Sequence, residues 1–130
     1  MSSLEKARPW LEKAAHDLHS AQIIYEHAPQ YWDTIAFHCQ QSVEKCLKAY
    51  LVFLEISFRR THDLVYLLHL ISEKTAVDEA LFEMAYLLEA AGVEFRYPDH
   101  RTGLEPDEVR EAIEAAAFFQ RFVFEKMGLI

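Results

Sequence analysis

Two arginines, a tyrosine and a histidine lie within one short stretch of this chain, Arg96-Tyr97-Pro98-Asp99-His100-Arg101. An arginine guanidinium can hold phosphate or carboxylate oxygens in a bidentate fork, and an imidazole can transfer protons near neutral pH. Pro98 restricts the backbone, so Arg96 loses less freedom when it binds an anion. We therefore predict that Arg96 and Tyr97 bind a ligand, with the tyrosine as a stacking ring. Arg96 and His100 are the candidate catalytic pair.

Glu44 and Lys48 belong to a polar row that interrupts an otherwise apolar segment. They are four residues apart, in the order that favours an ion pair along one side of a helix. The simplest interpretation is a salt bridge on the protein surface. A polar row beside an apolar stripe also suits a central helix whose edge faces a partner or a cleft. Glu44 is, in addition, a carboxylate that Arg96 would pair with if Arg96 were structural.

The sequence Thr61-His62-Asp63-Leu64 marks the start of a short helix. Thr61 is the expected N-cap, and Asp63 in the first turn complements the helix dipole. His62 and Asp63 therefore have a structural interpretation, which we prefer. Their functional interpretation is contact with a phosphate or polar ligand, because N–H groups point outward at a helix start.

No metal site and no cofactor are predicted. His16 and His19 are three residues apart and could share a metal ion, but no further ligand accompanies them in the sequence. Cys39 and Cys46 are two helical turns apart, which is too far for a disulfide within one helix. We expect them to be small buried residues with free thiols, as in a reducing cytoplasm.

The formal net charge of -8 disfavours broad, non-specific binding to nucleic acid, which needs many cations to neutralise phosphates. A local anion site is still compatible with the uneven charge distribution. No apolar run approaches 18 residues, so no membrane span is expected. Six of the thirteen cations have few acids near them in sequence: Lys45, Lys48, Arg59, Arg60, Arg96 and Arg101.

Hydrophobic residues at steps of three and four predict an all-α fold. The clearest case is the segment 32–55, which contains neither glycine nor proline. Gly92 is the expected stop of the fourth helix, and Phe118 and Phe122 add a second apolar row to the fifth. That row is either a subunit interface or a thick core stripe. The expected helices span about 9–27, 32–55, 64–72, 76–91 and from 106 onward. We predict one domain, 1–130, forming an antiparallel up-and-down four-helix bundle with a short extra helix.

Four sequence stretches together resemble the HEPN domain family, the higher eukaryote and prokaryote nucleotide-binding domains. The resemblance covers nearly the whole chain, with the motifs in the family's order and spacing. They are Ala15-His16-Asp17-Leu18, the run from Ala36 to Ala49 (AFHCQQSVEKCLKA), Thr61-His62-Asp63-Leu64 and Arg96-Tyr97-Pro98-Asp99.

The resemblance implies the bundle described above, often as a dimer, with Glu44 and Lys48 in the polar wall of a cleft. Small bacterial and archaeal members commonly accompany a minimal nucleotidyltransferase, encoded next door, in a toxin–antitoxin-like pair. On this basis we predict a homodimeric, cytoplasmic protein that binds a nucleotide, an RNA or a partner, with a minimal nucleotidyltransferase as the expected partner.

Many HEPN proteins are also metal-independent RNases that carry an Arg, four to six residues and then a His. Three residues separate Arg96 from His100, two separate Arg59 from His62, and seven separate Arg8 from His16. The nuclease spacing is therefore absent. One alternative function is an RNase toxin with a non-standard Arg/His site, and another is a non-catalytic dimeric interaction module.

A substitution at Arg96 distinguishes ligand binding from structural pairing. Arg96→Ala is expected to preserve the fold and weaken nucleotide or partner binding by about 1.5–3 kcal/mol, the scale of a charge-assisted hydrogen bond. Arg96→Lys keeps the charge but loses the fork, so it is expected to lose affinity too. Calorimetric melting and binding titrations measure both properties. A lower melting temperature with unaltered affinity would identify Arg96 as a structural clamp.

Overall fold

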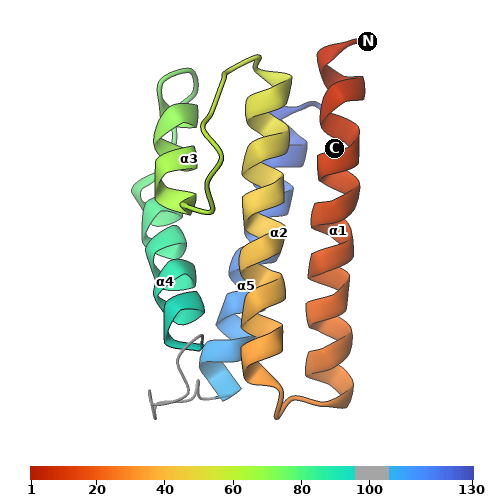
Figure 1. Cartoon of the computed structure of the whole chain (residues 1–130), viewed down its shortest axis with the longest axis vertical. Helices are drawn as coiled ribbons and strands as arrows, with labels where there is room; N and C mark the ends of the chain where they lie inside the picture. Colours follow the sequence, from red (N-terminus) through yellow and green to blue (C-terminus); the bar gives the residue numbers. More distant parts are fainter. Residues whose placement is uncertain (96–105) are drawn as a thin grey trace.

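The computed structural model describes residues 1–95 and 106–130, except for the side chains of residues 91–95. The described ranges form helices joined by short connections, and they contain no strand. The first long helix (Ser3–His27) runs antiparallel to the second (Trp32–Phe53) and to the third (Pro106–Lys126), which run parallel to each other (Figure 1). The two remaining helices follow one another along the side of the second (Figure 1). The elements are α1 (Ser3–His27), α2 (Trp32–Phe53), α3 (Leu64–Ser72), α4 (Glu79–Phe95) and α5 (Pro106–Lys126). This is the predicted four-helix bundle with α3 as the short extra helix.

Helix α2 is the centre of the bundle and contacts each of the other four helices. Its apolar positions include Ile35, Val43 and Leu47, all with no exposed surface. Their spacings of eight and four residues keep them on one side of the helix. Additional buried positions lie beside this face, so α2 is covered on more sides than an amphipathic surface helix would be.

Small side chains allow α1 to approach α2 closely. Ala7, Ala14 and Ala21 recur every seven residues along α1, and none has exposed surface. The Ser42 hydroxyl of α2 donates a hydrogen bond to the Ala14 carbonyl oxygen at 2.8 Å. That hydroxyl is therefore paired although it is buried, as a buried polar group must be to avoid a desolvation penalty.

Helix α4 differs from its expected boundaries. It begins at Glu79 rather than near Ala76, and it continues through Gly92 to Phe95. The prediction that Gly92 would stop the helix was therefore wrong. Glycine lowers helix stability by only about 1 kcal/mol relative to alanine, so a helix passes through it when the following residues favour helix.

The second apolar row of α5 divides between core and surface. Phe122 packs edge-on against Tyr50 with ring centroids 6.3 Å apart. Phe118, by contrast, is 44% exposed. The row is therefore not simply a thick core stripe. In the described part of the chain, no helix is both long enough and apolar enough to cross a membrane.

Both cysteines are buried, as predicted, and burial raises the pKa of Cys39 and of Cys46 to about 12. This lowers the thiolate fraction roughly 1,000-fold relative to an exposed cysteine. We expect a polar thiol reagent at pH 8 to label the native protein far more slowly than the urea-unfolded chain. Rapid labelling of both thiols under native conditions would contradict this expectation.

Candidate functional site

The connection between α2 and α3 brings residues distant in sequence together. Glu55 ends α2 with a left-handed backbone (φ 60°), and Ile56 N donates to the Leu51 carbonyl oxygen at 2.9 Å. This bond closes the last turn of α2 in the manner of a Schellman motif. The chain then runs back along α2, and α3 begins beside its middle (Figure 1). The end of the connection therefore lies next to residues well inside α2.

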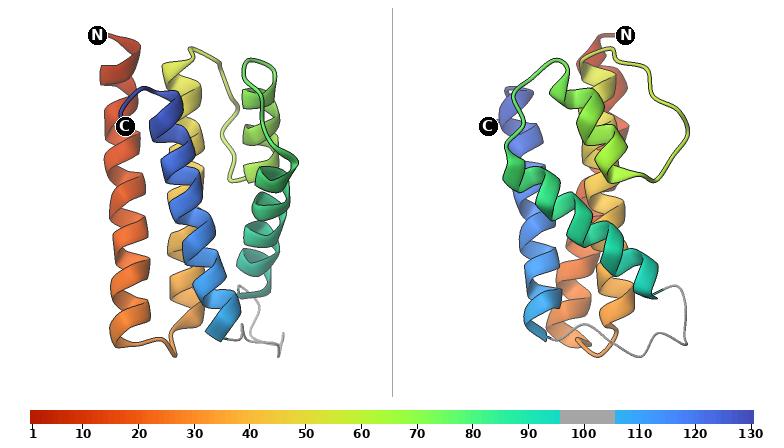
Figure 2. Two further views of the ribbon diagram at one scale, coloured as in Figure 1. Left: turned by 180° about the vertical axis from the view of Figure 1, so that it is seen from behind. Right: turned by 90° about the vertical axis from the view of Figure 1, so that its left-hand side faces the viewer.

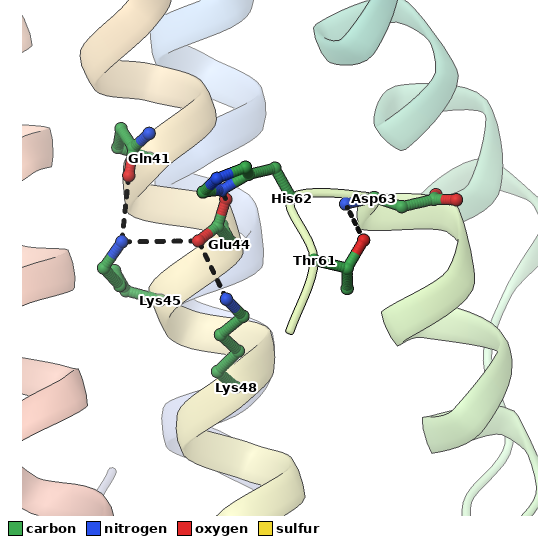
Figure 3. Close-up of polar contacts among 7 residues, drawn as sticks. All are labelled: Gln41, Glu44, Lys45, Lys48, Thr61, His62 and Asp63. Carbon is green, nitrogen blue, oxygen red and sulfur yellow. Dashed lines mark hydrogen bonds and ion pairs between the residues drawn. The ribbon is translucent and has the colours of Figure 1, made fainter. Parts of the chain in front are cut away.

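A buried carboxylate is the centre of this region. Glu44 is 1% exposed and accepts hydrogen bonds from Lys48 Nζ at 3.0 Å and from His62 Nδ1 at 2.7 Å. Lys45 Nζ lies 3.4 Å from the same carboxylate and also donates to Gln41 Oε1 at 2.9 Å. Figure 3 shows these side chains converging on Glu44 from α2 and from the returning connection. We call these five residues the Glu44 cluster.

The charges around Glu44 determine whether its carboxyl group is ionised. Burial alone would raise the pKa of Glu44, but hydrogen bonds from His62 and Lys48 and the positive charges of Lys45 and Lys48 lower it. The net effect is a pKa below the ordinary value, so Glu44 is an anion at neutral pH. Two lysines and one histidine surround a single negative charge, which leaves the cluster with excess positive charge.

The Glu44–Lys48 pair is buried rather than on the surface. Lys48 is 7% exposed, and its Nζ lies 5.7 Å from the ring centroid of Trp10 and 5.9 Å from that of Phe58. Aromatic faces attract a cation, so these rings stabilise the ammonium while excluding water. The interpretation as a surface salt bridge was therefore wrong, because the rings of α1 and of the α2–α3 connection cover the pair.

Only part of the Glu44 cluster is accessible to a ligand. The His62 side chain is 69% exposed and that of Lys45 is 19% exposed, whereas Lys48 is covered. Because an ionised carboxylate can only accept, His62 Nδ1 carries the hydrogen shared with Glu44. Its Nε2 is then a free acceptor when the ring is neutral and a second donor when the ring is protonated. A ligand from solvent would meet His62 and Lys45 first.

Asp63 points away from Glu44 and caps α3 (Figure 3). Its Oδ1 accepts from Tyr66 N at 3.0 Å, and Thr61 Oγ1 accepts from Asp63 N at 3.0 Å. The prediction of Thr61 as the N-cap was therefore wrong by two residues, because Asp63 still has extended backbone angles. Of the two adjacent predicted ligand residues, the structure brings His62 to Glu44 and Lys48, and it separates Asp63 from them.

A second carboxylate shares the start of α3. Glu89 of α4 accepts from Val65 N at 3.1 Å, next to the Asp63 cap. Burial raises the pKa of Glu89, the Val65 hydrogen bond lowers it, and the neighbouring Asp63 carboxyl raises it further, for a net rise. Asp63 thus has both a capping role and a close acidic neighbour, which makes an anion contact at this position unfavourable.

The remaining predicted site residues, Arg96, Tyr97 and His100, lie outside the described residues. The predicted catalytic pair of Arg96 and His100 and the predicted Arg96–Glu44 pairing stay predictions. Among residues 1–95 and 106–130, no group of three or more histidine, cysteine or acidic side chains is arranged to hold a metal ion.

Sequence reasoning missed a second carboxylate–imidazole pair, between α1 and α2. His38 Nδ1 lies 3.0 Å from Asp17 Oδ1, and Asp17 is only 5% exposed. No role of its own was predicted for Asp17 or for His38. A signal was available, since Asp17 stands three residues after Ala14 and four before Ala21, on the buried face of α1. An acidic residue at such a position needs a partner on the facing helix.

Neutralising Glu44 is expected to destabilise the fold. Glu44→Gln leaves the buried Lys48 ammonium without a counter-charge, which should lower the free energy of unfolding by about 3 kcal/mol at pH 7. Because the folded pKa of Glu44 is below its ordinary 4.5, this stabilisation is complete above that pH and is lost as the pH falls through the folded value. We therefore expect urea denaturation to show that the free energies of unfolding of the Glu44→Gln variant and of the unaltered protein become similar as the pH falls from 7 to 3.

Glu114→Gln is the matched control for this experiment. Glu114 is exposed and lies 3.7 Å from Arg110 Nε, a surface pair of small energetic value. Its substitution is expected to leave stability nearly unchanged at every pH. Equal losses in the two variants, or a Glu44→Gln loss that persists unchanged in acid, would contradict the assigned role of the buried carboxylate.

Comparison with known proteins places this architecture in a family. The HEPN domain profile matches residues 7–127. The crystal structure of TT1696 from Thermus thermophilus superposes with a TM-score of 0.82 at 30% identity, covering 93% of this chain and 98% of that one. ST0689, described as an archaeal HEPN homologue, shares the fold with a TM-score of 0.73 at 24% identity, covering 93% and 97%. No curated protein sequence matches. The chain belongs to the HEPN domain family.

Proposed function

We propose that this HEPN protein binds a phosphate-bearing ligand, a nucleotide or an RNA segment, at the exposed edge of the Glu44 cluster. The observation that carries the proposal is the convergence of Lys45, Lys48 and His62 within 3.4 Å of one buried carboxylate. Glu44 holds the three cationic or protonatable groups in place and neutralises only one charge. An anion at this edge would gain charge-assisted hydrogen bonds without first having to order the side chains.

The neighbouring arginines extend this positive edge. Arg59 stacks its guanidinium on the Tyr66 ring, with the guanidinium carbon 3.8 Å from the ring centroid. Arg59 and Arg60 are both exposed, three and two residues before His62. In a chain whose net charge is -8, such a local group of cations focuses anion binding on one area. Arg96 and Tyr97 are proposed as further ligand contacts.

The proposal includes protein partners. We propose that the chain acts with a minimal nucleotidyltransferase in a toxin–antitoxin-like pair and forms a homodimer, which is supported by family membership and by the family's small prokaryotic members. Exposed aromatic residues offer two faces for self-association: Phe118 on α5, which is 44% exposed, and Phe37 at the edge of α2, which is 47% exposed. Co-purification with a nucleotidyltransferase encoded beside this gene tests the first partner.

RNA cleavage is a second candidate, favoured by one observation. Glu44 orients His62 through Nδ1, which leaves Nε2 directed away from the carboxylate as a proton acceptor. A carboxylate-oriented imidazole is a common arrangement for general base catalysis. In this role His62 would take the proton of a ribose 2′-hydroxyl, whose oxygen bonds to the adjacent phosphorus to form a 2′,3′-cyclic phosphate. The bond from phosphorus to the 5′-oxygen breaks, and that oxygen takes a proton from water.

Titration with ATP and with a labelled ten-nucleotide single-stranded RNA tests the ligand site. His62→Ala and Lys45→Ala are each expected to weaken binding of at least one probe by about 10-fold, which corresponds to about 1.4 kcal/mol. Lys74→Ala is the control, because Lys74 is an exposed lysine beyond the end of α3. Equal affinities in all three variants, or no binding by the unaltered protein, would contradict the proposal. Gel analysis of the same RNA samples separates binding from cleavage.

A further inference from the structure

An apolar groove lies between α4 and α5, away from the Glu44 cluster. Helix α4 is inclined relative to α5, so the two helices separate along part of their length (Figure 2). The groove has a volume of about 390 Å³. Its apolar lining in the described part of the chain consists of Met84, Leu87, Leu88, Ala112, Ala115 and Phe118.

The groove exposes large apolar side chains that the core does not use. Leu87 is 69% exposed and Phe118 is 44% exposed, whereas the neighbouring Leu88 is 4% exposed and belongs to the core. Two large apolar side chains on either side of a depression, rather than scattered singly, are typical of an interaction surface.

One edge of the groove is acidic. Glu108, Glu111 and Glu114 line it from α5 at steps of three residues, which places them along one side of the helix. Arg110 contacts Glu114 at 3.7 Å and Asp107 at 3.3 Å, so it offsets only part of this charge. Among the described residues, Glu111 and Glu114 together with Arg110 leave one net negative charge beside the apolar floor.

We propose that this groove binds an amphipathic helix of a partner protein. Leucine-like residues of that helix would fill the groove between Leu87 and Phe118, and its lysines or arginines would pair with Glu111 and Glu114. This combination of apolar anchors and flanking charges is how helices are recognised in grooves. The inference rests on charge complementarity and is independent of the proposed ligand site.

A second copy of this chain fits the groove less well. The described lining of the groove holds three glutamates and no lysine or arginine, so a second copy docked through the same lining would supply no cation to pair with them. Like charges placed against one another in an interface reduce affinity. Of the two faces proposed for self-association, the Phe37 edge of α2 would leave the groove open to a partner.

Fluorescence anisotropy with a synthetic helical peptide of leucines on one face and lysines on the other tests the proposal. The full chain is expected to bind it, and Leu87→Ser with Phe118→Ser is expected to weaken binding at least about 10-fold, the scale of hot-spot loss. Glu111→Lys with Glu114→Lys should also weaken binding and reduce its dependence on salt. A peptide with glutamates in place of the lysines should bind far more weakly.

Tyr86→Ser and Glu125→Lys are the matched controls, because both residues are exposed and neither lines the groove. They are expected to leave the affinity unchanged. The proposal is overturned if the groove variants bind the basic peptide as well as the controls do, or if both peptides bind equally. It is also overturned if sedimentation shows that the unaltered chain is a dimer and that the Leu87→Ser, Phe118→Ser variant is a monomer. Circular dichroism confirms that each variant remains folded.

Discussion

The burial of the Glu44 carboxylate is the constraint on which the site depends. A charge withdrawn from water is tolerated only when donors replace its hydration. Lys45 and Lys48 are supplied by α2 itself, but the shortest bond comes from His62, at 2.7 Å. The hydrogen bond from His62 to Glu44 therefore holds the α2–α3 connection against α2. The position of α3 follows from it, since Asp63 caps that helix one residue after His62.

The same arrangement makes a structural cluster compatible with the ligand-binding edge that we propose. Lys48 is enclosed by Trp10 and Phe58, so its charge contributes to the fold. His62 and Lys45 share the same carboxylate but keep exposed atoms. A group that is anchored on one side and free on the other is already oriented before a ligand arrives. Such preorganisation reduces the entropy lost on binding.

Accessible positive charges and the glutamates of the groove lie on different parts of the molecule. The accessible cations around His62, Arg59 and Lys45 lie on α2 and the α2–α3 connection, whereas the glutamates that line the α4–α5 groove lie on α5. An acidic chain can therefore offer a local anion site and a distinct surface for a basic partner. The two surfaces suit ligands of opposite charge, so one protein could bind both kinds without competition between them.

Because hydrophobic periodicity and proline positions act locally, sequence by itself determined the order of the helices and the bundle, although the ends of α4 differ from those expected. Helix α1 ends at His27, as Pro29 predicted, and helix α3 spans Leu64–Ser72, as the spacing of Leu64 and Ile71 predicted. The Glu44–Lys48 pair follows from helical geometry. Only the tertiary structure decided the burial of that pair, the bond from His62 and the partnership of Asp17 with His38. These depend on which helix faces which, and on a connection that reverses direction after Glu55. No local pattern specifies such contacts, since His62 stands 18 positions after Glu44 and His38 stands 21 positions after Asp17.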